Sequence, residues 1–142
     1  MAVARREAAP YAGRPRMTDE TLLLRQVHPS WVQLDRVTSQ VFRPTPKDQK
    51  RLSAYDGDQI SAAGSWNHFT EILGFDSAGV LAVTQGECLQ LKLTVQPDPE
   101  PFPEHTVIDF SAFEEAEIKR KAKQLKAAAE ARGWMHQARL EK

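Results

Sequence analysis

Short apolar runs separated by polar segments dominate the first half of the chain, and they predict strands. The run Thr21–Val27 ends at His28-Pro29 and predicts a first, buried strand. Residues Arg36–Phe42 alternate between two faces, which predicts a second strand. Prolines then interrupt regular pairing before a short third strand, expected at Arg51–Tyr55.

Helical spacing appears after the turn at residues 56–58. The pattern predicts a helix capped by Ser61 and stopped by Gly74, with four apolar residues on one side: Trp66, Phe69, Ile72 and Leu73. The continuous apolar run Gly79–Val83 predicts another buried strand. Thr84 and Glu87 have capping-box spacing, which predicts a brief helix through Leu91.

The last third of the chain predicts two strands and a long helix. The strands are expected at Leu93–Gln96 and Thr106–Phe110, on either side of a proline-rich loop that should bulge outward. Ser111 and Glu114 fit a second capping box, opening a helix that Gly133 ends. Its narrow apolar stripe consists of Ile118, Ala122, Leu125 and Ala129.

The elements follow the order β-β-β-α-β-α-β-β-α, which is typical of α+β proteins. We expect a single mixed or antiparallel sheet with three helices on one face, including the long C-terminal helix. A length of 142 residues suits one domain. We therefore expect a disordered basic arm over residues 1–17, one α+β domain over 18–135 and a tail over 136–142. Whether residues 1–16 belong to the functional protein stays open, because Met17 is also a plausible start. Trp134-Met135 are expected to fold back on the core.

Charge and cysteine content narrow the class of protein. Nineteen Lys and Arg balance nineteen Asp and Glu, so no global field attracts nucleic acid or an anionic membrane. No run approaches the roughly 18 apolar residues of a transmembrane helix. The N-terminus lacks the apolar segment of a secretory signal, and a single cysteine, Cys88, fits a reducing compartment. We expect a cytoplasmic protein that binds neither membrane nor nucleic acid.

The segment Val27–Tyr55 mixes His, Arg, Lys, Asp and hydroxyl residues, which a purely structural hairpin does not need. His28 follows a predicted strand, where an imidazole is placed to move a proton; a structural histidine that bonds a turn carbonyl is the favoured alternative. His105, before a later strand, is the natural second histidine. His68 and His136 are expected at the surface.

The same segment carries the residue types of an anion pocket. These are four cations, Arg43, Lys47, Lys50 and Arg51, near three hydroxyls, Ser39, Thr45 and Ser53. Asp48 is placed to orient one of the cations. No Gly-rich phosphate loop accompanies them, so an ordinary solvated loop is the alternative.

Cys88 lies at the start of a predicted short helix, where the helix dipole would favour a thiolate. The alternative is a small buried apolar residue, and the capping box already accounts for Glu87. No spacing of His, Cys, Asp or Glu indicates a metal site, so we expect none.

Five motifs together resemble a group of small, uncharacterised bacterial proteins. They are L-x-R-x-x-H-P-S-W (Leu23–Trp31), S-x-x-F-x-P (Ser39–Pro44), D-x-x-x-L-S (Asp48–Ser53), V-x-x-G-E-C (Val83–Cys88) and P-x-P-F-P-E-H (Pro99–His105). That group has no activity to carry over. Arg25 on a first strand, a hydroxyl-rich second strand and L-S-x-Y before a helix are also similar to small NAD-consuming toxins of the ADP-ribosyltransferase-like class. This second resemblance implies NAD as cofactor and an acidic catalytic residue late in the fold, for which Glu104 is a candidate.

Two hypotheses follow. In the first, the protein binds a protein partner as an accessory or regulatory component of an operon or defence-type system, without a cofactor. In the second, it is a small nucleotide- or NAD-using enzyme with His28 and Ser39 as catalytic residues. Its ligand, a phosphate compound, would then be held by residues chosen from Arg25, Arg43, Asp48, Arg51, Ser53 and His105.

Overall fold

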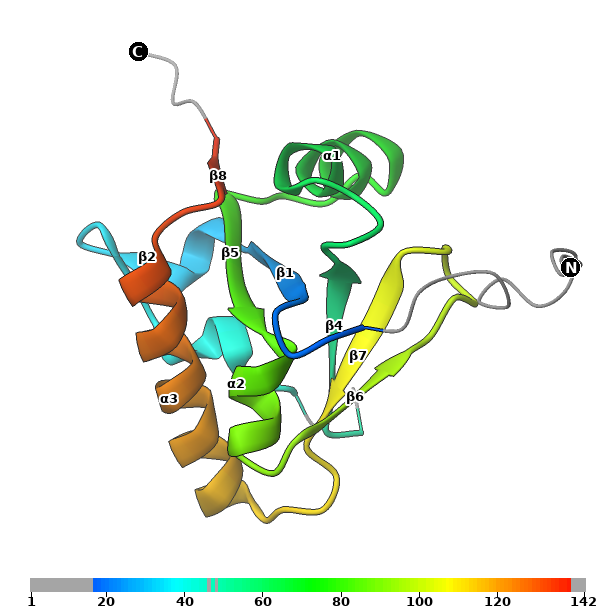
Figure 1. The fold of residues 1–142 in the computed structure, drawn as a ribbon. Helices are drawn as coiled ribbons and strands as arrows, with labels where there is room; N and C mark the ends of the chain where they lie inside the picture. The colour runs from blue at the N-terminus through cyan, green and yellow to red at the C-terminus, as the bar shows by residue number, and fades with distance from the viewer. Residues whose placement is uncertain (1–16, 46, 48, 139–142) are drawn as a thin grey trace, which may run out of the picture.

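A six-stranded antiparallel sheet forms the centre of the protein in the computed structural model, which describes residues 17–45, 47 and 49–138. The strand order is β6-β7-β4-β1-β5-β8 (Figure 1). The strands are β1 (Leu22–Val27), β4 (Arg51–Asp56), β5 (Gly79–Thr84), β6 (Thr94–Pro97), β7 (His105–Asp109) and β8 (His136–Gln137). A separate hairpin pairs β2 (Val32–Gln33) with β3 (Arg36–Val37).

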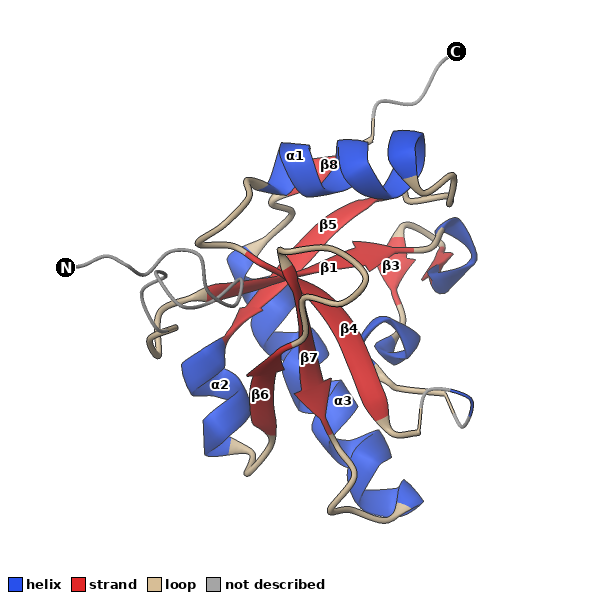
Figure 2. Ribbon diagram, turned by 90° about the vertical axis from the view of Figure 1, so that its right-hand side faces the viewer, coloured by secondary structure: helices blue, strands red, loops and turns tan. Residues whose placement is uncertain are grey.

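Helices cover both faces of the sheet, not one face as expected. The helices α3 (Glu115–Arg132) and α2 (Gln85–Gln90) lie on one face, while α1 (Ala62–Asn67) lies on the other (Figure 2). A π-helical turn, His68–Ile72, continues α1. The two faces follow from strand alternation, because Leu23 of β1 packs in the α3 core and its neighbour Leu24 packs with α1. Since β1 is apolar on both faces, the sheet is covered on both sides.

Most of the expected elements are present near their predicted ends. The first capping box is confirmed: the Thr84 hydroxyl accepts from the Glu87 amide at 3.0 Å, and the Glu87 carboxylate accepts from the Thr84 amide at 2.8 Å. Ser61 caps α1, and Gly74 follows the π-helical turn with φ of +79°. The predicted stripe of α3 is buried, and Trp134 and Met135 fold back on the core as expected.

The expected second strand, Arg36–Phe42, is wrong. Leu34 and Asp35 adopt positive φ angles of 52° and 66°, which fold Val32–Val37 into a tight hairpin. Residues Ser39–Phe42 then form a 3-10 helix, whose Val41 and Phe42 are buried in the α3 core. Only Arg36–Val37 of this segment is a strand, so its alternation reflected one arm of the hairpin followed by a short helix.

Two boundaries also differ from the sequence-based expectation. Ser111 does not cap α3: its amide bonds the Asp109 carboxylate at 2.7 Å, and the helix begins after Glu114 without a side-chain cap. The sheet continues past residue 135, where the domain was expected to end, because β8 pairs with β5.

Among the described residues, no helix has the length and apolar character needed to cross a membrane.

The sheet is split between β1 and β4. These strands share two residue pairs, Leu23 with Asp56 and Leu24 with Tyr55. By contrast, β1 pairs with β5 over six residues, and β4 pairs with β7 over five. The strands thus diverge in the middle of the sheet, and this opening positions the candidate site.

Candidate functional site

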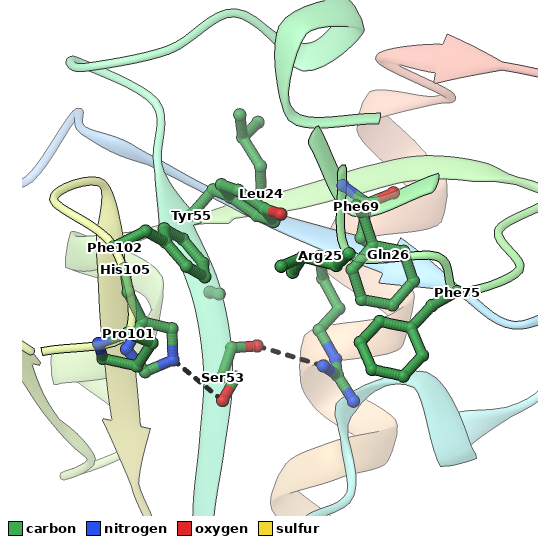
Figure 3. Close-up of a pocket in the computed structure, with 12 residues that line it drawn as sticks. Leu24, Arg25, Gln26, Ser53, Tyr55, Phe69, Phe75, Pro101, Phe102 and His105 are labelled. Atoms are coloured by element: carbon green, nitrogen blue, oxygen red, sulfur yellow. Dashed lines mark hydrogen bonds between the residues drawn. The ribbon is translucent and has the colours of Figure 1, made fainter. Parts of the chain in front are cut away.

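A pocket of about 260 Å³ lies where β1 and β4 diverge (Figure 3). Its polar side chains come from the two strands and β7: Arg25, Gln26, Ser53 and His105. Its apolar wall comes from the π-helical turn, the segment after it and the proline-rich loop: Phe69, Leu73, Phe75, Pro101 and Phe102. A few convergent polar groups in an aromatic hollow are typical of a small-molecule site.

Arg25 bridges the opening with its side chain. Its Nε donates to the carbonyl oxygen of Val41 at 2.6 Å, and its Nη1 donates to that of Ser53 at 3.0 Å. The Ser53 carbonyl belongs to the diverging strand β4, so the guanidinium takes the place of a backbone donor from β1. The guanidinium also lies 5.5 Å from the centre of the Trp31 ring. These contacts fix a half-buried positive charge at the edge of the pocket.

A chain of hydrogen bonds links Ser53, His105 and Asp98. The hydroxyl of Ser53 lies 3.0 Å from Nε2 of His105 (Figure 3). On the other side of the ring, Nδ1 lies 2.8 Å from the backbone carbonyl of Asp98 and 3.4 Å from its carboxylate. The pairing of β4 with β7 places Ser53 diagonally across from His105, and Asp98 directly follows β6. His105 is 8% exposed, whereas Ser53 is exposed.

Aromatic contacts hold the proline-rich loop over the site. Phe102 stacks on Tyr55 at 4.9 Å between ring centres and meets the edge of His105 at 5.1 Å. The Tyr55 hydroxyl bonds Nδ1 of His68 at 2.7 Å, so His68, expected at the surface, is a partly buried member of this cluster. Burial, followed by the charge of Glu104, raises the pKa of Tyr55 well above its usual value. Tyr55 is therefore a neutral hydrogen-bond donor.

Two neighbouring hollows also contain Arg25. One, of about 430 Å³, is lined by Trp31, Gln40, Arg43 and Glu115, among others. The other, of about 260 Å³, includes His28, Trp31, Phe69 and Phe75. Arg25 thus lines all three hollows. Their aromatic residues are Phe69, Phe75 and Phe102 in the first, Trp31 in the second, and Trp31, Phe69 and Phe75 in the third.

The structure brings together three of the predicted site residues, Arg25, Ser53 and His105. Arg51 lies beside Ser53 and His105 in a further polar hollow that also contains Lys47 and Asp98. Arg43 reaches the second hollow and forms an ion pair with Glu115 at 2.8 Å. Asp48 lies outside the described residues.

The two predicted catalytic residues lie outside the pocket between β1 and β4, although His28 lines the third hollow with Arg25. His28 is exposed and caps the 3-10 helix Pro29–Trp31, with Nδ1 accepting from the Ser30 amide at 3.0 Å. His28 therefore has the structural role, bonding to a local turn, that was the alternative to proton transfer. Ser39 belongs to the 3-10 helix Ser39–Phe42 and lines none of the four hollows.

Cys88 is fully buried, and burial followed by the charge of Glu87 raises the pKa of its thiol to about 12. The thiol is therefore protonated at neutral pH, and the small buried residue is the correct alternative. In the part of the chain that the structure describes, no group of three or more His, Cys, Asp or Glu side chains is placed to hold a metal ion.

Sequence reasoning missed Asp98, Phe69, Phe75 and Phe102 as site residues. Phe102 carried a signal, because it is an aromatic residue within a loop of prolines that was expected to face solvent. Asp98 carried no such signal, since its role depends on the pairing of β6 with β7.

Comparison with models of protein families, with curated proteins and with solved structures finds no match to this chain.

Proposed function

We propose that the protein is a small enzyme that binds a dinucleotide such as NAD across the three hollows that Arg25 lines. The observation that carries this proposal is the position of Arg25, a fixed guanidinium that lines three adjoining hollows, each of which contains aromatic side chains. A dinucleotide has the matching form, because two flat ring systems flank a negatively charged pyrophosphate. Guanidinium groups bind phosphate through paired, charge-assisted hydrogen bonds.

The size of the hollows supports an extended ligand over a compact one. The pocket between β1 and β4 has about 260 Å³, which suits one ring and its sugar, and the neighbouring hollows extend past Trp31. Arg43 offers a second cation in the largest hollow. Its ion pair with Glu115 joins side chains that are 38% and 60% exposed, so exchanging that partner for a ligand costs little.

Within this proposal, the nicotinamide end occupies the pocket beside Phe69, Phe75 and Phe102. Ser53 and His105 are the polar groups that meet it there. This assignment keeps the resemblance to NAD-consuming enzymes but replaces His28 and Ser39 with His105 and Ser53. The first hypothesis from the sequence, a protein that binds a protein partner, stays a prediction.

Isothermal titration calorimetry with NAD, AMP and nicotinamide mononucleotide tests the proposal. We expect NAD to bind more tightly than either half. Arg25→Met should weaken NAD binding about ten- to a hundredfold, since a hydrogen bond to a charged group contributes about 1.5 to 3 kcal/mol. Phe75→Ala should weaken it about tenfold by removing a ring that is 57% exposed and outside the core.

Arg120→Met is the matched control, because Arg120 lies on α3, pairs with Glu117 and contributes to none of these hollows. It should bind NAD as the wild type does. Since Arg25 also bridges two strands, circular dichroism must confirm that its variant is folded, and Phe75→Ala serves as the second variant. Absence of NAD binding by the wild type, or equal affinity in the wild type and Phe75→Ala, would overturn the proposal.

A further inference from the structure

We propose that Ser53 is an activated nucleophile that accepts the acyl group of small carboxylic esters with an apolar or aromatic acyl part. This activity goes beyond dinucleotide binding, because it needs the pocket between β1 and β4 and neither of the other two hollows. It rests on the contacts of Ser53, His105 and Asp98 and on the apolar wall that faces them.

The contacts of His105 determine which ring nitrogen carries the proton. The carbonyl oxygen of Asp98 can only accept, so Nδ1, at 2.8 Å from it, must be the donor. In the neutral ring Nε2 is then unprotonated and accepts from the Ser53 hydroxyl at 3.0 Å. This is the tautomer that a general base for Ser53 requires. Asp98 is a positioning residue, whose carbonyl and carboxylate both face Nδ1.

The surroundings of Ser53 suit attack on an ester. Ser53 is an exposed residue that lines the pocket, so a substrate in the pocket can approach its side chain. The Arg25 guanidinium donates to the backbone carbonyl of the same residue and lines the same pocket, so a positive charge is available in the pocket to an oxyanion that forms there. Phe69, Phe75 and Phe102 then provide an apolar surface for the acyl group.

The reaction has two balanced steps. In the first, the oxygen of Ser53 forms a bond to the ester carbonyl carbon while its proton passes to Nε2 of His105. The bond from that carbon to the alcohol oxygen then breaks, and the leaving alcohol takes the proton from Nε2. In the second, water attacks the acyl-Ser53 ester through the same base, which releases the carboxylic acid and restores the Ser53 hydroxyl.

An alkyl fluorophosphonate probe, read by mass spectrometry of the full-length protein and its peptides, tests the nucleophile directly. Reaction forms a bond from the Ser53 oxygen to phosphorus and releases fluoride, with the proton leaving through His105. We expect one label, on Ser53, and none on Ser53→Ala. His105→Gln should slow labelling at least about a hundredfold, within the usual contribution of general acid–base catalysis. Hydrolysis of p-nitrophenyl butyrate should follow the same order.

The chain offers a matched control in a second serine–histidine pair. The Ser30 hydroxyl lies 2.8 Å from Nδ1 of His28, but both residues are exposed, and this nitrogen also accepts from the Ser30 amide. Ser30→Ala should therefore label and hydrolyse as the wild type does. Labelling of Ser30 in place of Ser53, an unlabelled wild type, or equal labelling of the wild type and His105→Gln would each overturn the inference. Ser53→Ala keeps the backbone carbonyl that Arg25 binds, so we expect it to fold, and circular dichroism checks this.

Protection by NAD separates this inference from the proposed function. If NAD occupies the pocket, saturating NAD should slow labelling of Ser53 in proportion to its occupancy. Labelling that NAD does not affect would uphold the nucleophile and contradict the dinucleotide site. NAD binding by calorimetry together with an unlabelled Ser53 would contradict the nucleophile alone.

Discussion

Glu87 of α2 joins this helix to the end of β5, through Thr84, and to the end of α3, through Arg132. Its carboxylate accepts from the Thr84 amide at the start of α2 and from both terminal nitrogens of Arg132, at 2.8 and 3.2 Å, at the end of α3. Burial alone would raise the pKa of Glu87, but the hydrogen bonds from Arg132 and Thr84 outweigh it and hold the pKa below its usual value. The ionised form of Glu87 therefore stabilises the folded state.

The pH dependence of stability follows from this lowered pKa. Its contribution is fully present above the pKa of the unfolded chain, about 4.3, and is lost as pH falls through the lower folded pKa. At pH 7, Glu87→Gln should reduce the free energy of unfolding by about 1 kcal/mol, a value discounted because the ion pair is partly exposed. Urea titrations should show this difference shrinking as the pH falls below the pKa of the unfolded chain.

Glu115→Gln is the comparison, because its ion pair with Arg43 is more exposed than that of Glu87. It should change stability less at every pH. A Glu87→Gln difference that is constant from pH 7 to pH 3 would show that the carboxylate is not stabilised by folding.

At the scale of elements, β4 has a different neighbour on each side. The amides of Asp56 and Phe110, bonded to the carbonyls of Glu104 and Lys50, show that even-numbered positions of β4 face β7. The Ser53 carbonyl faces the other way and meets the Arg25 side chain. Because the N–H and C=O groups of one strand residue point to the same side, the Ser53 amide faces the opening between β1 and β4.

Hydrogen exchange followed by NMR should detect this alternation. We expect the Ser53 amide to exchange at least about tenfold faster than those of Leu52 and Ala54, which face the paired strand β7. NAD or another ligand of the pocket should reduce the difference. Equal protection of the three amides would mean that β1 and β4 close along their length in solution.

The strands β1, β5 and β7 could be predicted because each carries an apolar run, and β4 and β6 because each is a short segment bounded by turn or proline-rich residues. The segment Arg36–Phe42 could not, because its polar and apolar positions fit a strand as well as a hairpin arm followed by a 3-10 helix. Positive φ angles at Leu34 and Asp35 decided between them. Asp is common in turns, but leucine is not a residue type that signals a positive φ angle. The two-residue strand β8 is likewise too short to leave a pattern.

At the scale of the whole molecule, the larger core lies between the sheet and α3. Leu125 is 1% exposed at its centre. Leu125→Ala should lower the free energy of unfolding by about 2 to 5 kcal/mol, since it removes buried methyl groups and leaves a cavity. Chemical denaturation measures this loss. Lys123→Ala, at an exposed position of the same helix, should stay within about 0.5 kcal/mol of the wild type. Similar losses in both variants would argue against this packing.

The residues of the candidate site were partly predictable, because their side-chain types suit catalysis or binding. Which of them meet could not be predicted, because that depends on the order and register of the strands. Arg25, Ser53 and His105 were candidates on their own chemistry. Their meeting required β4 to lie between β1 and β7, which no local pattern encodes. His28 and Ser39 were candidates on the same grounds. In the structure His28 caps the 3-10 helix Pro29–Trp31, and Ser39 lies in the 3-10 helix Ser39–Phe42.

The divergence of β1 and β4 divides the sheet into two halves of three strands each, β6-β7-β4 and β1-β5-β8. Two residue pairs and one arginine side chain join them within the sheet. This seam is the mechanical weak line of the sheet, because every other junction between its long strands has at least four residue pairs. A force applied across the strands should separate the two halves there first. An anion bound at Arg25 should make that separation harder.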